Sequence, residues 1–226
     1  MLRVLIFGAT GMVGQGVLRE CLAASDVSLV QTVGRTATRH EHAKIHELSL
    51  ANLLEYAGVE SELKNFDACF FCLGVTSSGM SESDYAKLTF DVTLAAANTL
   101  VGLNPQMTFI YVSGAGTDST EKGRSMWARV KGRTENALQR LPFKAVYIFR
   151  PGAIVPLHGV KSKTTSYRIL YTMTAPLLPL FRWLAPNTIL TTEIMGQAML
   201  NAVRHGAPKA VLESSDINQL AIGARP

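Results

Sequence analysis

Cysteines and charged residues are both scarce in this sequence. Only three cysteines occur, and a small, odd number does not build a disulfide framework. Charged residues make up 17% of the chain against 47% hydrophobic ones, so a buried core is expected and long disordered tails are not. Cys69 and Cys72 lie three apart in an apolar, strand-like run, where their side chains point to opposite faces. We interpret them as buried small side chains rather than a redox pair.

Targeting signals and metal-ligand spacing are lacking as well. No basic segment followed by a long apolar stretch and a cleavage site opens the sequence, so we expect a cytoplasmic protein. The apolar residues 169–181 form too short a run for a membrane-spanning helix, and two prolines interrupt it. His40, His42 and His46 have no suitably spaced fourth ligand, which favours a solvated loop and no metal site.

Strand-like and helix-like runs alternate along the chain. The expected strands cover residues 2–7, 28–33, 45–50, 68–73, 108–113, 144–149 and 210–213, and the expected helices cover residues 12–24, 53–63, 82–103, 124–141 and 193–205. Such alternation predicts βαβ units with right-handed crossovers. We therefore expect one α/β domain over residues 1–226, a Rossmann-type doubly wound parallel sheet with helices on both faces.

A glycine-rich turn follows the first expected strand and opens the first expected helix. In such a turn Gly8 permits the tight bend, Gly11 lets the backbone approach a pyrophosphate, and Gly14 lets the helix pack on the sheet. The free N–H groups of the helix N-terminus attract phosphate. The context predicts a dinucleotide site rather than a structural turn without ligand. Its expected contacts are Gly8, Thr10, Gly11, Met12, Val13 and Gly14.

Four later motifs accompany the turn in order. They are Phe70-Phe71-Cys72-Leu73-Gly74, Tyr111-Val112-Ser113, Lys131-Gly132-Arg133-Thr134-Glu135 and Arg150-Pro151-Gly152. Together with the G-x-x-G-x-x-G spacing, this series resembles the extended and atypical short-chain dehydrogenase/reductase proteins, among them those described as NAD(P)H-binding or nucleoside-diphosphate-sugar-epimerase-like. The resemblance implies an active-site Ser113, a catalytic Lys131 that also holds the nicotinamide ribose, and cofactor contacts from Leu73, Gly74, Pro151 and Gly152.

The second expected strand ends without the carboxylate that would bind the ribose 2′-OH of NAD. Arg35, and with it Arg39, can instead pair with a 2′-phosphate through charge-assisted hydrogen bonds. We therefore expect NADP as the cofactor, with NAD as the alternative if Arg35 is only a solvated loop charge. By resemblance, Asn52 stands where the family often has an Asp near the adenine ring.

The catalytic motif departs from the family pattern. Reductases and epimerases of this kind carry Tyr-x-x-x-Lys, but Trp127 stands four residues before Lys131. An indole N–H can donate a hydrogen bond but cannot exchange a proton near neutral pH. Three readings stay open: an oxidoreductase on a small molecule whose proton comes from another group, a non-catalytic NADP-binding sensor, scaffold or assembly protein, and an epimerase or isomerase. Ser113, Tyr85 and the hydroxyls of residues 76–78 are alternative proton donors.

Acidic residues are absent between Glu135 and Glu193, a stretch that carries seven basic residues. Within residues 151–192 the resemblance implies a substrate-side lid. The basic, apolar residues 161–186 are alternatively a protein-binding surface or a peripheral contact with anionic membrane. Nucleic acid is not an expected partner, because no binding motif occurs. His158 is a further candidate for the substrate pocket, and the expected helices 82–103 and 124–141 are, by analogy, a homodimer interface.

Overall fold

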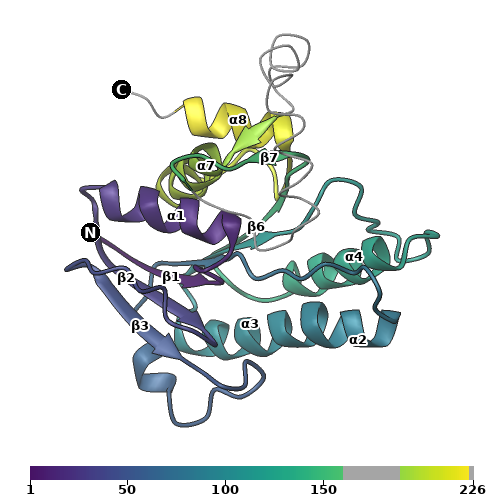
Figure 1. The fold of residues 1–226 in the computed structure, drawn as a ribbon, viewed down its shortest axis with the longest axis horizontal. Helices are drawn as coiled ribbons and strands as arrows, with labels where there is room; N and C mark the ends of the chain where they lie inside the picture. The colour runs from purple at the N-terminus through teal and green to yellow at the C-terminus, as the bar shows by residue number, and fades with distance from the viewer. Residues whose placement is uncertain (160–188, 224–226) are drawn as a thin grey trace.

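A seven-stranded, entirely parallel sheet forms the centre of the protein, whose computed structural model describes residues 1–159 and 189–223 (Figure 1). The strand order is β3-β2-β1-β4-β5-β6-β9. Because the order reverses between β1 and β4, a crevice is expected at the carboxyl ends of these two strands. The strands are β1 (Leu2–Phe7), β2 (Val27–Gly34), β3 (Ile45–Ser49), β4 (Ala68–Phe71), β5 (Thr108–Val112), β6 (Ala145–Arg150) and β9 (Val211–Glu213).

Helices cover both faces of this sheet (Figure 1). One face carries α1 (Met12–Ala23), α7 (Thr192–His205) and α8 (Ser214–Ile222); the other carries α2 (Glu82–Ala86), α3 (Val92–Leu103) and α4 (Met126–Leu138). A π-helical turn, Lys87–Asp91, joins α2 to α3, and two short strands, β7 (Ile154–Val155) and β8 (Leu190–Thr191), pair beside the main sheet. The expected three-layer, doubly wound Rossmann-type fold is confirmed.

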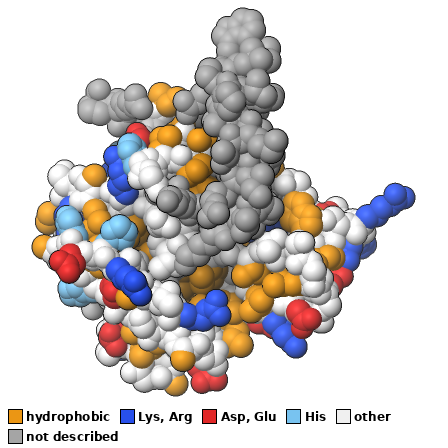
Figure 2. Space-filling model, viewed as in Figure 1, with side chains coloured by type: hydrophobic (Ala, Val, Ile, Leu, Met, Phe, Trp, Pro, Cys, Tyr) orange, Lys and Arg blue, Asp and Glu red, His pale blue; other side chains and the backbone are white. Residues whose placement is uncertain are grey.

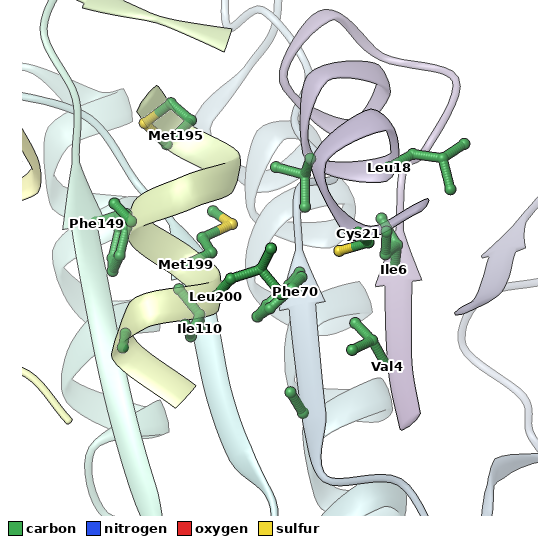
Figure 3. Close-up of a cluster of buried hydrophobic side chains, with 14 of the residues drawn as sticks. Val4, Ile6, Leu18, Cys21, Phe70, Ile110, Phe149, Met195, Met199 and Leu200 are labelled. Carbon is green, nitrogen blue, oxygen red and sulfur yellow. The ribbon is translucent and has the colours of Figure 1, made fainter. Parts of the chain in front are cut away.

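Helices α1 and α7 pack closely against each other on their face of the sheet. A Cβ atom on Gly16 would lie 2.5 Å from Thr192 Cβ, and one on Gly196 would lie 2.6 Å from Glu20 Cγ, so both glycines are required at this crossing. Beneath the crossing, apolar side chains of α1 and α7 meet those of the central strands (Figure 3). This cluster includes Val4, Ile6, Leu18, Cys21, Phe70, Ile110, Phe149, Met195, Met199 and Leu200.

The second core lies between the sheet and the α3–α4 layer. Cys69 belongs to this core, whereas Cys72 packs against the cluster on the α1–α7 side. The prediction that these two cysteines face opposite ways is confirmed, and both thiols are free. Alternation along a strand explains the result, since residues at odd separations point to opposite faces.

The predicted helix over residues 53–63 is wrong apart from a 3-10 turn, Glu60–Leu63. Gly58 adopts a φ of +87°, which interrupts any helix there. Asn52 also stabilises a turn, because its Oδ1 accepts a hydrogen bond from the Leu54 N–H at 3.0 Å. The helix expected over residues 124–141 spans only Met126–Leu138, and α8 corresponds to no expected helix.

The basic, apolar residues 161–186 lie outside the described residues, so the lid, partner and membrane alternatives stay predictions. Among residues 1–159 and 189–223, the structure contains no helix with the length and hydropathy needed to cross a membrane.

Candidate functional site

The glycine turn brings the end of β1, the end of β4 and the start of α1 into contact. Gly8 has a φ of +79°, and a Cβ atom there would lie 2.9 Å from the Leu73 backbone nitrogen. A Cβ atom on Gly14 would lie 2.2 Å from the Gly8 carbonyl oxygen. Neither position accepts a side chain without backbone movement, so this tight form of the turn requires glycine at both.

The N-terminus of α1 presents its backbone amides at this turn. Gly11 occupies the N-cap position and has no side chain to cap them, and the first turn carries no acidic residue. Met12 and Val13 form that first turn and pack their side chains on the core below. Open amides and a positive helix end fit a phosphate group. The residues present therefore fit the pyrophosphate of a dinucleotide.

A cavity of about 440 Å³ continues from the turn across the carboxyl ends of β2 and β3. Arg35 is an exposed part of its wall and, within the described residues, forms no ion pair. Arg39 does not line the cavity. The wall consists of Gly8, Ala9, Thr10, Thr32, Val33, Gly34, Arg35, Thr36, Ala37, Thr38, Glu47, Leu48, Ser49, Leu53 and Leu73.

Asn52 is held away from this wall, although its neighbour Leu53 lines it. The Asn52 side chain accepts from the Leu54 N–H and donates its Nδ2–H to Glu55 at 2.8 Å. Its amide is thus engaged on both sides in the local turn. The structure does not bring Asn52 together with the other residues expected at the cofactor.

Glu47 is a wall residue that sequence reasoning missed. It lies on β3, opposite Thr32 of β2, and its Oε1 accepts hydrogen bonds from both the backbone N–H and the hydroxyl of Thr38. A carboxylate therefore does reach the cavity, from β3 rather than from the end of β2. The only signal in the sequence was its place in a poorly marked strand.

A second group of site residues gathers where β5 and β6 end against α4. Ser113 is buried, and its hydroxyl donates to the carboxylate of Glu135. Glu135 has a fully buried side chain and pairs with Arg150, whose Nε lies 3.1 Å and 3.2 Å from its two oxygens. The proton of Ser113 is therefore directed to an ion pair. Glu135 stands in one of the four motifs, but its hydrogen bond with Ser113 was not predicted from the sequence.

Lys131 lies one helical turn before Glu135 on the same helix. Its Nζ is 3.5 Å from the Val112 carbonyl oxygen and 5.3 Å from the centre of the Tyr111 ring. Burial lowers the pKa of Lys131 to about 8, and the carboxylate of Glu135 opposes this shift. Lys131 is thus an amine that can both give and accept a proton near neutral pH.

Trp127 packs its ring over the loop that follows β5. Cβ atoms built on Gly114 and Gly116 would lie 4.0 Å and 3.6 Å from its ring atoms. The indole therefore covers the loop beside Ser113. Burial raises the pKa of Tyr85 and of Tyr111, so neither phenol is a better acid than a free tyrosine.

The remaining predicted positions lie along the same edge of the sheet. Leu73 contacts the glycine turn and the cavity, and Gly74 next to it has open space at its Cβ position. The Pro151 carbonyl accepts from Ala115 N–H at 2.9 Å, whereas the Gly152 N–H donates to Ser214 Oγ at 2.9 Å.

His158 and His42 each form a hydrogen bond outside the two groups of site residues described above. His158 pairs with Glu193 at 3.2 Å, which lowers the pKa of that carboxyl group. His42 accepts a hydrogen bond from the backbone N–H of Lys44. Among the described residues, no three His, Cys, Asp or Glu side chains gather in a way that could hold a metal ion.

Solved structures share this fold. The enzyme WbmF from Bordetella bronchiseptica, solved in complex with NAD⁺, superposes with a TM-score of 0.68 at 14% identity, over 98% of this chain and 76% of that one. An oxidoreductase of the short-chain dehydrogenase/reductase family from Burkholderia thailandensis gives a TM-score of 0.66 at 15% identity, over 99% and 94% of the two chains. The resemblance expected from the motifs is confirmed at the level of the fold.

Curated relatives extend over much of the chain, although no family model matches it. Protein FMP52 of Chaetomium globosum is 25% identical over 96% of this chain and 95% of its own. Protein HTATIP2 of Rattus norvegicus is 27% identical over 67% of this chain and 62% of its own. The fungal relatives are named mitochondrial, and this finding contradicts the prediction of a cytoplasmic protein.

Proposed function

We propose that the protein binds a nicotinamide dinucleotide along the carboxyl edge of its sheet, with NADP(H) preferred over NAD(H). The glycine turn carries the proposal, because its two crowded positions and open helix N-terminus fit a pyrophosphate. The cavity of about 440 Å³ beside it suits an adenosine moiety. Solved neighbours that hold NAD⁺ support the same placement.

Arg35 supports the preference for the phosphorylated cofactor, because its guanidinium is exposed on the cavity wall. A charge-assisted hydrogen bond to a 2′-phosphate contributes about 1.5–3 kcal/mol. We therefore expect Arg35→Ala to weaken NADPH about 10–100-fold in a fluorescence titration and to leave NADH nearly unchanged. Arg39→Ala is the matched control, since Arg39 lies outside the wall. Equal weakening of both cofactors by Arg35→Ala would refute the assignment.

The reaction that this arrangement supports best is oxidoreduction of a small molecule. The bound cofactor would supply the hydride. The indole N–H of Trp127 is too weak an acid to transfer its proton near neutral pH, and the Ser113 hydroxyl donates a hydrogen bond to Glu135. Lys131 is then the group at this edge that can supply a proton to a reduced carbonyl oxygen, because burial brings its pKa to about 8.

This reaction is tested by NADPH oxidation with a broad panel of carbonyl compounds. We expect turnover with at least one compound, a rate that falls above about pH 8, and loss of turnover in Lys131→Ala. Ser113→Ala is expected to have the smaller effect, because its hydroxyl faces the ion pair. Turnover that is unchanged in Lys131→Ala would rule out this role.

The second candidate is a protein that binds NADP(H) without turnover. The observation in its favour is that two hydroxyls of the family pattern are not available as proton donors. Trp127 replaces the tyrosine, and the hydroxyl of Ser113 already donates to Glu135. Such a protein would bind NADPH yet oxidise it with no compound of the panel. Reductase activity that appears only in Trp127→Tyr would favour this candidate.

A further inference from the structure

The wall of the cavity beside the glycine turn carries two opposite charges, which come from different strands. Arg35 follows β2 and Glu47 lies within β3, and both line the same space of about 440 Å³. They form no ion pair with each other within the described residues, so neither neutralises the other by direct contact. Figure 2 shows basic, acidic and histidine side chains interspersed over one face of the molecule.

Within the described residues, Oε1 is the oxygen of the Glu47 carboxylate that accepts hydrogen bonds from the protein. Its Oε1 accepts from the Thr38 N–H at 2.6 Å and from the Thr38 hydroxyl. These bonds tie the segment after Arg35 to β3 and thereby shape the cavity. The residue is exposed, so its charge acts on whatever enters the cavity.

We infer that Glu47 is a specificity-determining residue of this cavity, whose negative charge opposes the 2′-phosphate that Arg35 attracts. The inference rests on the proposed dinucleotide function and deepens it. A phosphate monoester carries a charge of about −1.5 to −2 at pH 7, whereas a ribose 2′-OH is neutral. Glu47 therefore penalises NADP(H) but not NAD(H), and it can accept a hydrogen bond from the hydroxyl of the latter. We therefore expect the wild-type protein to prefer NADP(H) over NAD(H) less strongly than it would if only Arg35 acted on the 2′-phosphate.

A charge-only substitution separates this effect from the structural one. Glu47→Gln retains an acceptor oxygen for Thr38 and removes the charge. Thr38→Val retains the charge of Glu47 and removes the hydroxyl that binds it. If charge decides the preference, only Glu47→Gln changes the affinity ratio of a ligand with a 2′-phosphate to one without.

The experiment is isothermal titration of the full chain with 2′,5′-ADP and with 5′-AMP, at low and high salt. We expect Glu47→Gln to tighten 2′,5′-ADP about 3–10-fold relative to 5′-AMP, as removal of one nearby exposed charge predicts. This gain in affinity should be smaller in 1 M salt, where the Debye length falls to about 3 Å and the charge of Glu47 is screened. Thr38→Val should leave the ratio unchanged.

Two failures are distinguishable. If wild-type protein binds 2′,5′-ADP and Arg35→Ala weakens it, but Glu47→Gln leaves the ratio unchanged, the inference on Glu47 is overturned and the proposed function stands. A parallel loss of both ligands in Glu47→Gln and Thr38→Val would show a purely structural role and overturn it too. If neither nucleotide nor NADPH binds the wild type, the proposed function fails and the inference falls with it.

Discussion

Removal of the charge of Glu135 should destabilise the protein more than removal of any exposed ion-pair partner. The Glu135 side chain is 0% exposed and that of Arg150 is 13% exposed. Glu135→Gln keeps the volume and one acceptor oxygen, but it removes the buried countercharge of the Arg150 guanidinium and leaves it only the more exposed Glu213, 3.5 Å from its Nη1. Breaking a buried pair in this way costs about 3–5 kcal/mol, because the remaining charge stays desolvated.

The measurement is urea unfolding followed by circular dichroism, with the free energy of unfolding taken by linear extrapolation. We expect Glu135→Gln to lower this free energy by about 3 kcal/mol or more. The double variant Glu135→Gln with Arg150→Met should recover much of the loss, since the guanidinium that lost its buried partner is then gone. The coupling in the double-mutant cycle should therefore reach about 2–3 kcal/mol.

The matched control is Arg204→Met, which breaks the exposed pair of Arg204 with Asp26. The side chains of that pair are 28% and 44% exposed, and we expect a change of at most about 1 kcal/mol. If Glu135→Gln costs no more than this control, or if the double variant loses the sum of its two single losses, the reasoning on the buried pair is refuted.

Three further predictions concern titration, packing and thiol reactivity. Burial lowers the pKa of Lys131 from 10.5 to about 8, so between these values the unfolded chain binds more protons. Stability measured from pH 7.5 to 10 should thus rise by about 1–3 kcal/mol relative to Lys131→Met, and parallel curves would contradict this. Gly16→Ala should lower the free energy of unfolding by about 1–3 kcal/mol through overlap with α7, whereas Gly102→Ala, with open space at its Cβ, should raise it by about 0.4–1 kcal/mol; equal effects would contradict the packing argument. The free, buried thiols of Cys21 and Cys69 should react with a thiol reagent at pH 8 only after unfolding, whereas that of Cys72 is half-buried; rapid reaction of more than one thiol in the folded protein would contradict this.

Local pattern decided most of the fold. Strand-like runs and the glycine turn predicted β1, α1 and the parallel sheet, because hydrophobic periodicity and turn chemistry are properties of neighbouring residues. The same periodicity explains the opposite faces of Cys69 and Cys72. It failed over residues 53–63, where Gly58 adopts a positive φ that apolar spacing does not reveal.

The sequence by itself thus determined the α/β class, the glycine turn and the absence of a tyrosine four residues before Lys131. Tertiary structure alone decided the partners of the charged groups. Glu135 accepts from the hydroxyl of Ser113, directly after β5, and pairs with the guanidinium of Arg150 at the end of β6, and Glu47 reaches a cavity that begins at the end of β1. The physical reason is that a charge takes whichever partner the packing of distant strands brings within hydrogen-bond reach, and residue spacing along one chain does not encode that distance.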